Sequence, residues 1–315
     1  MVPTSGATAD DRDFIGLHKH DLSPEIFLGF PAPSPAESVH SALLYVIITL
    51  SRVFVKGSRQ GSPFPDFRGL KGGFPSPPVE PSCEDPWRLE HSTTDFYFSR
   101  LAAAYVRGRL GVTQPPLETL TERELAAVVT LGLEAGLRLH RFKRTMGLAR
   151  VSRALGILQG LRPDSLLDVG SGRGAFLWPL LDRFPDLPVT AIDTDPKRVA
   201  DIRSVAAGGI GTLTGRGGDV TRLEFGGGAF DVVTLLEVLE HVPQSERALS
   251  EAVRVARRFV VLSVPSHADD NPEHIHLFSR DRLADLLREA GAARVTTEAV
   301  HNHWIAVANV QTIHP

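Results

Sequence analysis

Short apolar runs alternate with amphipathic helical runs along the second half of the chain. The apolar runs have the length of buried strands, and the stretches between them are long enough to hold a helix. Strands joined through helices lie parallel, with helices covering both faces of the sheet. The pattern predicts strands over 165–169, 188–193, 230–236 and 258–264, and helices over 175–184, 245–257 and 280–290.

Two further apolar runs, at 293–300 and 304–310, are separated only by His301, Asn302 and His303. A gap of three residues is too short for a crossover between parallel strands. These two runs are therefore predicted to form an antiparallel hairpin. Another strand is poorly marked within the glycine-rich stretch 208–220.

A helical region precedes the alternating pattern, and we expect residues 92–161 to cover the sheet as a cap segment. Helices are predicted over 95–111, 125–140 and 151–161. Thr121 and Glu124 have the spacing of a capping box, which marks the start of the second helix. A basic cluster follows it, and this cluster is interpreted either as a solvated helix face or as a contact for an anionic substrate or a nucleic acid; it contains Arg141, Lys143, Arg144 and Arg150.

The first 91 residues differ in composition, and we expect a proline-rich, partly disordered leader there. Twelve of the 23 prolines lie in the first 86 positions, so regular helices and central strands are excluded from most of this stretch. Its longest apolar run, Ala42–Leu50, has nine residues, whereas a membrane-spanning helix takes about 20. The start of the chain lacks the pattern of a signal peptide, so we expect a cytoplasmic protein with no membrane contact.

Charge and cysteine content narrow the function classes. The formal net charge of −3 gives no general basic field, so binding of a nucleic acid would need a local patch. Cys83 is the single cysteine, which excludes an internal disulfide and a cysteine-based zinc site.

The stretch Ser165–Gly174 reads as a buried strand that ends in a glycine-rich turn. Gly170, Gly172 and Gly174 let the backbone bend tightly and approach a ligand closely. This predicts a nucleotide-like ligand at the carboxyl end of a central strand. Asp193, about 20 residues further on, is placed to accept the hydroxyls of a ribose, and Asp219 is placed to accept an adenine amino proton.

Residues 147–310 resemble the class I S-adenosylmethionine-dependent methyltransferases. The resemblance rests on LLDVGSGRG, VTAIDTDP, GDVTRLEF, FDVVTLLEVLEHVP and VLSVP, together with the closing hairpin. It implies an α/β fold with a seven-stranded, mostly parallel sheet, in a methyltransferase domain over 162–315. A nicotinamide dehydrogenase would use the same glycines and Asp193, but Asp219 and the hairpin would then be unexplained.

The same resemblance implies a division of the cofactor among named residues. Asp168, Gly170, Ser171 and Gly172 would lie along the methionine part, and Glu237 would lie beside the methyl-donor end. The ribose and adenine would be held by Asp193, Thr194, Asp219 and Val220.

Catalytic candidates lie after the predicted strands 230–236 and 258–264. A sulfonium methyl group is already activated, so the protein must mainly align the acceptor and exclude water. A hydroxyl acceptor also needs a base or a metal, whereas an amine only needs to be unprotonated. The predicted catalytic residues are Glu240, His241 and His276, whereas His301 and His303 are interpreted as surface or packing residues.

A divalent metal is a further hypothesis for this region. Glu237, Glu240 and His241 have the spacing of one helical face, and the segment 267–276 adds carboxylates and imidazoles, among them His276. This arrangement resembles the small-RNA 3′-terminal 2′-O-methyltransferases, in which such a group binds the metal. It also resembles the ubiquinone-biosynthesis O-methyltransferases and related enzymes that act on small molecules.

The favoured function is methyl transfer to oxygen or nitrogen of a small molecule, with no obligate protein partner. The alternatives are a metal-assisted RNA 2′-O-methyltransferase and a module that binds the cofactor without catalysis.

Overall fold

A computed structural model describes residues 97–144 and 147–310 of the chain. The proposed leader, 1–91, lies outside the described residues. The helices are α2 (Ser99–Leu110), α3 (Glu122–Glu134), α4 (Ala149–Leu161), α5 (Leu177–Arg183), α6 (Pro196–Ala207), α7 (Ser245–Val255) and α8 (Arg280–Glu289). The strands are β1 (Leu166–Val169), β2 (Val189–Asp193), β3 (Leu213–Gly217), β4 (Phe230–Leu236), β5 (Ala256–Pro265), β6 (Arg294–Val300) and β7 (His303–Asn309).

All seven strands form one sheet in the order β3-β2-β1-β4-β5-β7-β6. The pairs within β1–β5 are parallel, whereas β7 runs antiparallel to both β5 and β6. The predicted sheet and its closing hairpin are therefore confirmed. The strand that the sequence marks poorly is β3, which lies at one edge of the sheet.

The two faces of the sheet bury separate hydrophobic clusters, because side chains alternate along each strand. Leu166 of β1 belongs to a cluster with apolar residues of α2, α4, α5 and α6. Leu167 and Val169 point the other way and pack with apolar residues of α7 and α8. Helices therefore cover both faces, as the alternating pattern predicts.

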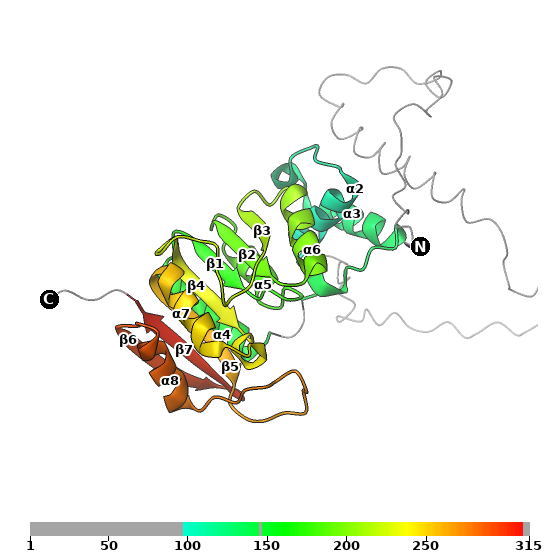
Figure 1. Cartoon of the computed structure of the whole chain (residues 1–315). Coiled ribbons are helices and arrows are strands. Elements are labelled where there is room, and N and C mark those ends of the chain that lie inside the picture. The colour runs from blue at the N-terminus through cyan, green and yellow to red at the C-terminus, as the bar shows by residue number, and fades with distance from the viewer. Residues whose placement is uncertain (1–96, 145–146, 311–315) are drawn as a thin grey trace, which may run out of the picture. The chain divides into compact units, whose positions relative to one another are not determined.

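The helices before β1 are part of this packing. α2 packs against α6 and α3, and Figure 1 shows α2 and α3 beyond α6, toward the β3 edge. The Thr121–Glu124 capping box is present at the start of α3. This helix ends at Glu134, short of the predicted 140, because Gly136 turns the chain with a φ of 76°.

Most arginines of the basic cluster at 140–150 form ion pairs within the protein. Arg141 pairs with Asp201 of α6, and Arg144 pairs with Asp182 of α5. Arg150 contacts Glu237 at the end of β4. Among the described residues, no helix combines the length and the apolar character that are needed to cross a bilayer.

Candidate functional site

A cavity of about 680 Å³ lies at the carboxyl ends of the parallel strands. It follows the turns after β1, β2, β3 and β4, which is where open α/β sheets bind ligands. Seven of the nine predicted cofactor residues line it: Gly170, Gly172, Asp193, Thr194, Asp219, Val220 and Glu237. The structure therefore brings these residues together at one cavity, and their contact with a cofactor stays a prediction.

The glycine turn after β1 needs its glycines for steric reasons. Gly170 has a φ of 69°, and a Cβ there would lie 2.7 Å from Cγ2 of Val238. Gly174 has a φ of 85°, and a Cβ there would collide with the indole of Trp178. The turn can therefore pass close under a ligand only while these positions lack side chains.

Asp168 and Ser171 lie beneath the turn and do not line the cavity. Both are buried, and Thr234 donates to Oδ1 of Asp168 over 2.9 Å. Burial raises the pKa of Asp168 to about 6, although the hydroxyls of Ser171 and Thr234 favour the charged form. Among the described residues, Oδ2 of Asp168 has no hydrogen-bond partner. This oxygen fits a cationic donor such as the ammonium group of a methionine-type cofactor.

Asp193 is fixed by backbone donors on both carboxylate oxygens. The N–H of Gly172 donates to Oδ2 over 2.8 Å, and the N–H of Asp195 donates to Oδ1 over 2.9 Å. Because each oxygen can accept a second hydrogen bond, the carboxylate keeps capacity for two hydroxyls of a ribose. Arg198, which the sequence analysis missed, also lines the cavity and lies 3.5 Å from Asp193.

Asp219 is held in a turn of its own. Its Oδ1 accepts hydrogen bonds from the backbone N–H and the hydroxyl of Thr221, over 2.8 and 2.9 Å. The buried Val220 beside it supplies an apolar wall. This pairing of a carboxylate with an apolar surface fits an adenine ring.

Glu237 departs from the helical turn that its spacing to Glu240 and His241 predicts. Its backbone has a φ of 57°, and only Leu239–His241 form a short 3₁₀ turn. Its carboxylate accepts a hydrogen bond from Ser263 over 2.7 Å and lies 2.9 Å from Nε2 of His303. His303 therefore contacts a cavity-lining residue, which the sequence analysis did not foresee.

The three predicted catalytic residues occupy different surroundings. His241 lines the cavity, whereas the side chain of Glu240 is fully buried. His276 places Nε2 3.1 Å from the carbonyl oxygen of Val242 and packs beside Phe278. His276 thus faces the backbone after the 3₁₀ turn, and the cavity lining does not include it.

Burial raises the pKa of Glu240 to about 8. In the described part of the chain, neither of its carboxylate oxygens has a hydrogen-bond partner. Its own backbone amide and Arg150 favour the charged form, but Glu237 and Asp269 oppose it. An unpaired buried carboxylic acid of this kind is a candidate ligand for a cation.

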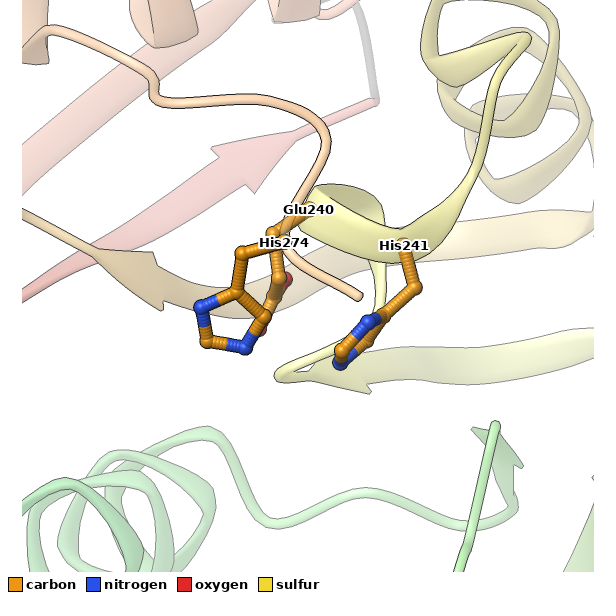
Figure 2. A group of neighbouring side chains, drawn as sticks. All are labelled: Glu240, His241 and His274. Atoms are coloured by element: carbon orange, nitrogen blue, oxygen red, sulfur yellow. The ribbon is translucent and has the colours of Figure 1, made fainter. Parts of the chain in front are cut away.

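Glu240 lies with His241 and His274 in a group that has suitable ligand types for a metal (Figure 2). One ligand atom from each of the three residues lies within 4.8 Å of the others. Nδ1 of His241 is 2.9 Å from the carbonyl oxygen of Glu273, and Nδ1 of His274 is 2.8 Å from Asp269. These contacts leave Nε2 of both rings available. The structure thus groups His274, rather than the predicted His276, with Glu240 and His241.

Comparisons with known proteins identify a methyltransferase domain in the chain. Residues 167–262 match the family model described as a methyltransferase domain. The chain is 44% identical over 87 residues to nocamycin O-methyltransferase of Saccharothrix syringae. These residues are 27% of this chain and 31% of that protein. It is 29% identical over 108 residues to ajmaline N-methyltransferase of Rauvolfia serpentina. These residues are 34% of this chain and 37% of that protein.

A third relative is malonyl-[acyl-carrier protein] O-methyltransferase of Geobacter sulfurreducens. It is 30% identical over 107 residues, which are 33% of this chain and 40% of that protein. The chain therefore spans only about a third of the length of these relatives. Among solved structures, an S-adenosylmethionine-dependent methyltransferase of Aquifex aeolicus is similar, with a TM-score of 0.43 and 19% identity. That likeness covers 50% of this chain and 88% of the other.

The matched segment contains most of β1, the glycine turn, Asp193 and Glu237, and the sheet has the seven strands and the closing hairpin that the resemblance implied. The family expected from the sequence is therefore confirmed: the chain contains a class I S-adenosylmethionine-dependent methyltransferase domain.

Proposed function

We propose that this protein transfers a methyl group from S-adenosylmethionine to an oxygen or nitrogen of a small molecule. The observation that carries the proposal is the cavity, which joins the ends of β1–β4 and brings Asp193, Asp219 and Glu237 to one lining. The names of the relatives, two O-methyltransferases and one N-methyltransferase, support both acceptor atoms.

Each part of the cavity has a proposed role. Gly170 and Gly172 let the backbone lie against the methionine part, and the buried Asp168 supports the turn from beneath. Asp193 with Thr194 holds the ribose, and Asp219 with Val220 holds the adenine. When bound, the cofactor supplies a methyl group already activated on a sulfonium, so the protein's remaining task is alignment.

His241 remains a proposed catalytic residue, because it is the one of the three that lines the cavity. Glu240 and His276 are proposed to support it. The backbone carbonyl of Glu240 accepts hydrogen bonds from the N–H groups of Ile275 and His276, over 2.9 and 3.2 Å. These bonds fix the segment after β5 against the turn that carries His241.

Calorimetry with S-adenosylhomocysteine tests the cofactor site. Asp193→Ala is expected to weaken binding by on the order of 100-fold, because two hydrogen bonds to a charged acceptor are lost. Asp186→Ala removes an exposed aspartate outside the cavity and is the control. Equal affinities of the two variants would contradict the assignment, provided that both melt cooperatively.

Methyl transfer from labelled donor to a cell extract tests the activity. The extract is separated into small-molecule, protein and RNA fractions, and label is expected among the small molecules. Label in RNA would favour the RNA 2′-O-methyltransferase instead. Cofactor binding without any transfer would favour the non-catalytic module.

A divalent metal stays a proposal, and Glu240, His241 and His274 are the residues that would hold it. Two imidazoles and one carboxylate suit a borderline cation such as Zn²⁺ or Mn²⁺, which would supply Lewis acidity near the cavity. If the metal is used, a chelator removes the transfer activity and added Mn²⁺ restores it. Activity that is indifferent to the chelator would contradict a catalytic metal.

A further inference from the structure

Glu237 is held in an unusual backbone conformation at the end of β4. It has a φ of 57°, a region that non-glycine residues seldom adopt because it strains the backbone. Its N–H donates to the carbonyl oxygen of Ser263, which ties the end of β4 to β5. Conformations of this kind persist only where surrounding contacts hold them, and they are concentrated at functional sites.

Three elements bring polar groups to the Glu237 carboxylate. Ser263 of β5 donates to Oε1 over 2.7 Å, and Nε2 of His303, the first residue of β7, lies 2.9 Å from Oε2. Nε of Arg150, in the first turn of α4, lies 3.5 Å from Oε2. The Glu237 and His303 side chains are 22% and 16% exposed, so the pair is partly shielded from water.

The hydrogen bonds of His303 fix how many protons the pair holds. Nδ1 lies 2.8 Å from the carbonyl oxygen of His301, which can only accept, so Nδ1 carries a hydrogen. Nε2 faces a carboxylate oxygen, and two lone pairs would repel each other at 2.9 Å. One further proton therefore lies between His303 and Glu237, on the ring or on the carboxyl group.

Glu237 also lines the cofactor cavity, whereas Ser263, His303 and Arg150 are not part of its lining. Glu237 thus belongs to the cavity lining, and its carboxylate contacts a set of donors outside that lining. Asp193 and Asp219 line the same cavity at the ends of other strands, β2 and β3, whereas Glu237 follows β4.

We propose that Glu237 is the catalytic residue that receives the acceptor's proton, and that His303 is the positioning residue that holds it for this step. The inference rests on the proposed function and names the proton-handling group of the same site. Transfer forms the bond between the acceptor atom and the methyl carbon and breaks the carbon–sulfur bond, whose electron pair stays on sulfur. The acceptor's proton passes to the Glu237 carboxylate while the shared proton is on Nε2 of His303. The pair then holds one proton more than before, and that extra proton leaves to water past the partly exposed His303.

The test compares variants of the full chain in the labelled-methyl assay. Glu237→Gln is expected to lower kcat by on the order of 100-fold or more, the usual contribution of a positioned acid or base, with S-adenosylhomocysteine affinity within about 3-fold of wild type. His303→Ala is expected to lower kcat nearly as much. His303→Gln keeps a donor toward Glu237 and is expected to recover part of the loss. His301→Asn is the control, because asparagine tolerates the positive φ of that exposed turn residue.

The same set of variants also tests whether His241, rather than Glu237, is the base. If His241→Gln abolishes transfer while Glu237→Gln leaves kcat unchanged, the proposal is overturned and His241 is the base. A matching loss of cofactor affinity in Glu237→Gln would also overturn it, because the residue would then belong to the cofactor site. A wild-type protein that transfers no methyl group would instead mark a failure of the proposed function.

Ring-nitrogen NMR of His303 checks the pair without an activity assay. The wild-type ring is expected to show a proton shared between Nε2 and Glu237, and Glu237→Gln is expected to leave a neutral ring. A wild-type spectrum with an unprotonated Nε2 that does not change in the variant would contradict the shared proton. Thermal melts separate these effects from a loss of fold.

Discussion

Glu240 holds a proton that the unfolded chain would release. Burial raises its pKa from 4.5 to about 8, so the folded protein favours the neutral acid. Between these two values the unfolded chain is ionised while the folded protein keeps its proton, so rising pH favours unfolding. The contribution of Glu240 to stability is therefore greatest below pH 4.5, decreases toward pH 8 and is then constant.

Glu240→Gln is expected to remove this pH dependence, because an amide does not titrate. Relative to wild type, its free energy of unfolding should rise by about 3–4 kcal/mol between pH 5 and pH 8. Urea denaturation in the presence of a chelator measures the difference at each pH. Glu246→Gln alters an exposed carboxylate and is the control. A difference between Glu240→Gln and wild type that stays constant with pH would contradict the prediction.

A site residue could be predicted from the sequence where its neighbours in the site are also close to it along the chain. It could not be predicted where its partner is far away in the sequence. The place of Asp193 in the cavity lining was predictable, because it follows from the length of one strand–helix–strand unit after the glycine turn. His303 was not, because its partner Glu237 lies 66 positions away and only the sheet order joins them. His274 and His276 are two residues apart in a loop, and nothing in their spacing indicates which ring turns toward Glu240.

At the scale of elements, α2 and α6 cross at two glycines. A Cβ on Gly108 would lie 1.9 Å from the carbonyl oxygen of Ser204, and one on Gly208 would lie 1.7 Å from that of Ala104. The helix backbones can therefore approach each other only because both positions lack a side chain. This contact joins the region before β1 to the sheet.

Gly208→Ala is expected to destabilise the fold by at least about 1–3 kcal/mol, because the added methyl group forces the two helices apart. Gly156→Ala in α4 is the matched control, since a Cβ there meets nothing within 4 Å. That control should gain about 0.5–1 kcal/mol from the higher helix propensity of alanine. Urea denaturation of the two variants measures both effects, and equal stabilities would show that the crossing is not tightly packed.

Helices and strands were predictable where the local hydrophobic pattern was strong. They were not predictable where contacts between distant parts of the chain determine the backbone conformation. β4 matches its predicted bounds, because a mostly apolar run of this length fits a buried strand of a parallel sheet. β3 is glycine-rich and lies at the sheet edge, so it carries little hydrophobic signal. The left-handed turn at Glu237 had no local marker, since a glycine or asparagine usually occupies such a position.

At the scale of the whole molecule, the region before β1 shares a hydrophobic cluster with the sheet. Leu101, Tyr105 and Val106 of α2 lie in the same cluster as β1 and β2. We propose that residues 1–91 form a leader and that 92–161 belong with the methyltransferase domain as its cover.

A chain that starts at Ser92 is therefore expected to keep its melting temperature and its affinity for S-adenosylhomocysteine. A chain that starts at Gly147 lacks α2 and α3 and is expected to be insoluble, because the apolar surface of α6 loses its cover. Solubility, melting and calorimetry compare the three lengths. Insolubility of the chain from Ser92 would show that the leader contributes to folding.

The reversed direction of β7 has a consequence for how this protein can change. An antiparallel strand brings its first residue, His303, to the edge where the parallel strands end. The groups that hold Glu237 therefore come from α4, β5 and β7, whereas the proposed cofactor contacts come from the turns after β1, β2 and β3. Substitutions in the first group can change how Glu237 is held while the proposed cofactor contacts stay as they are.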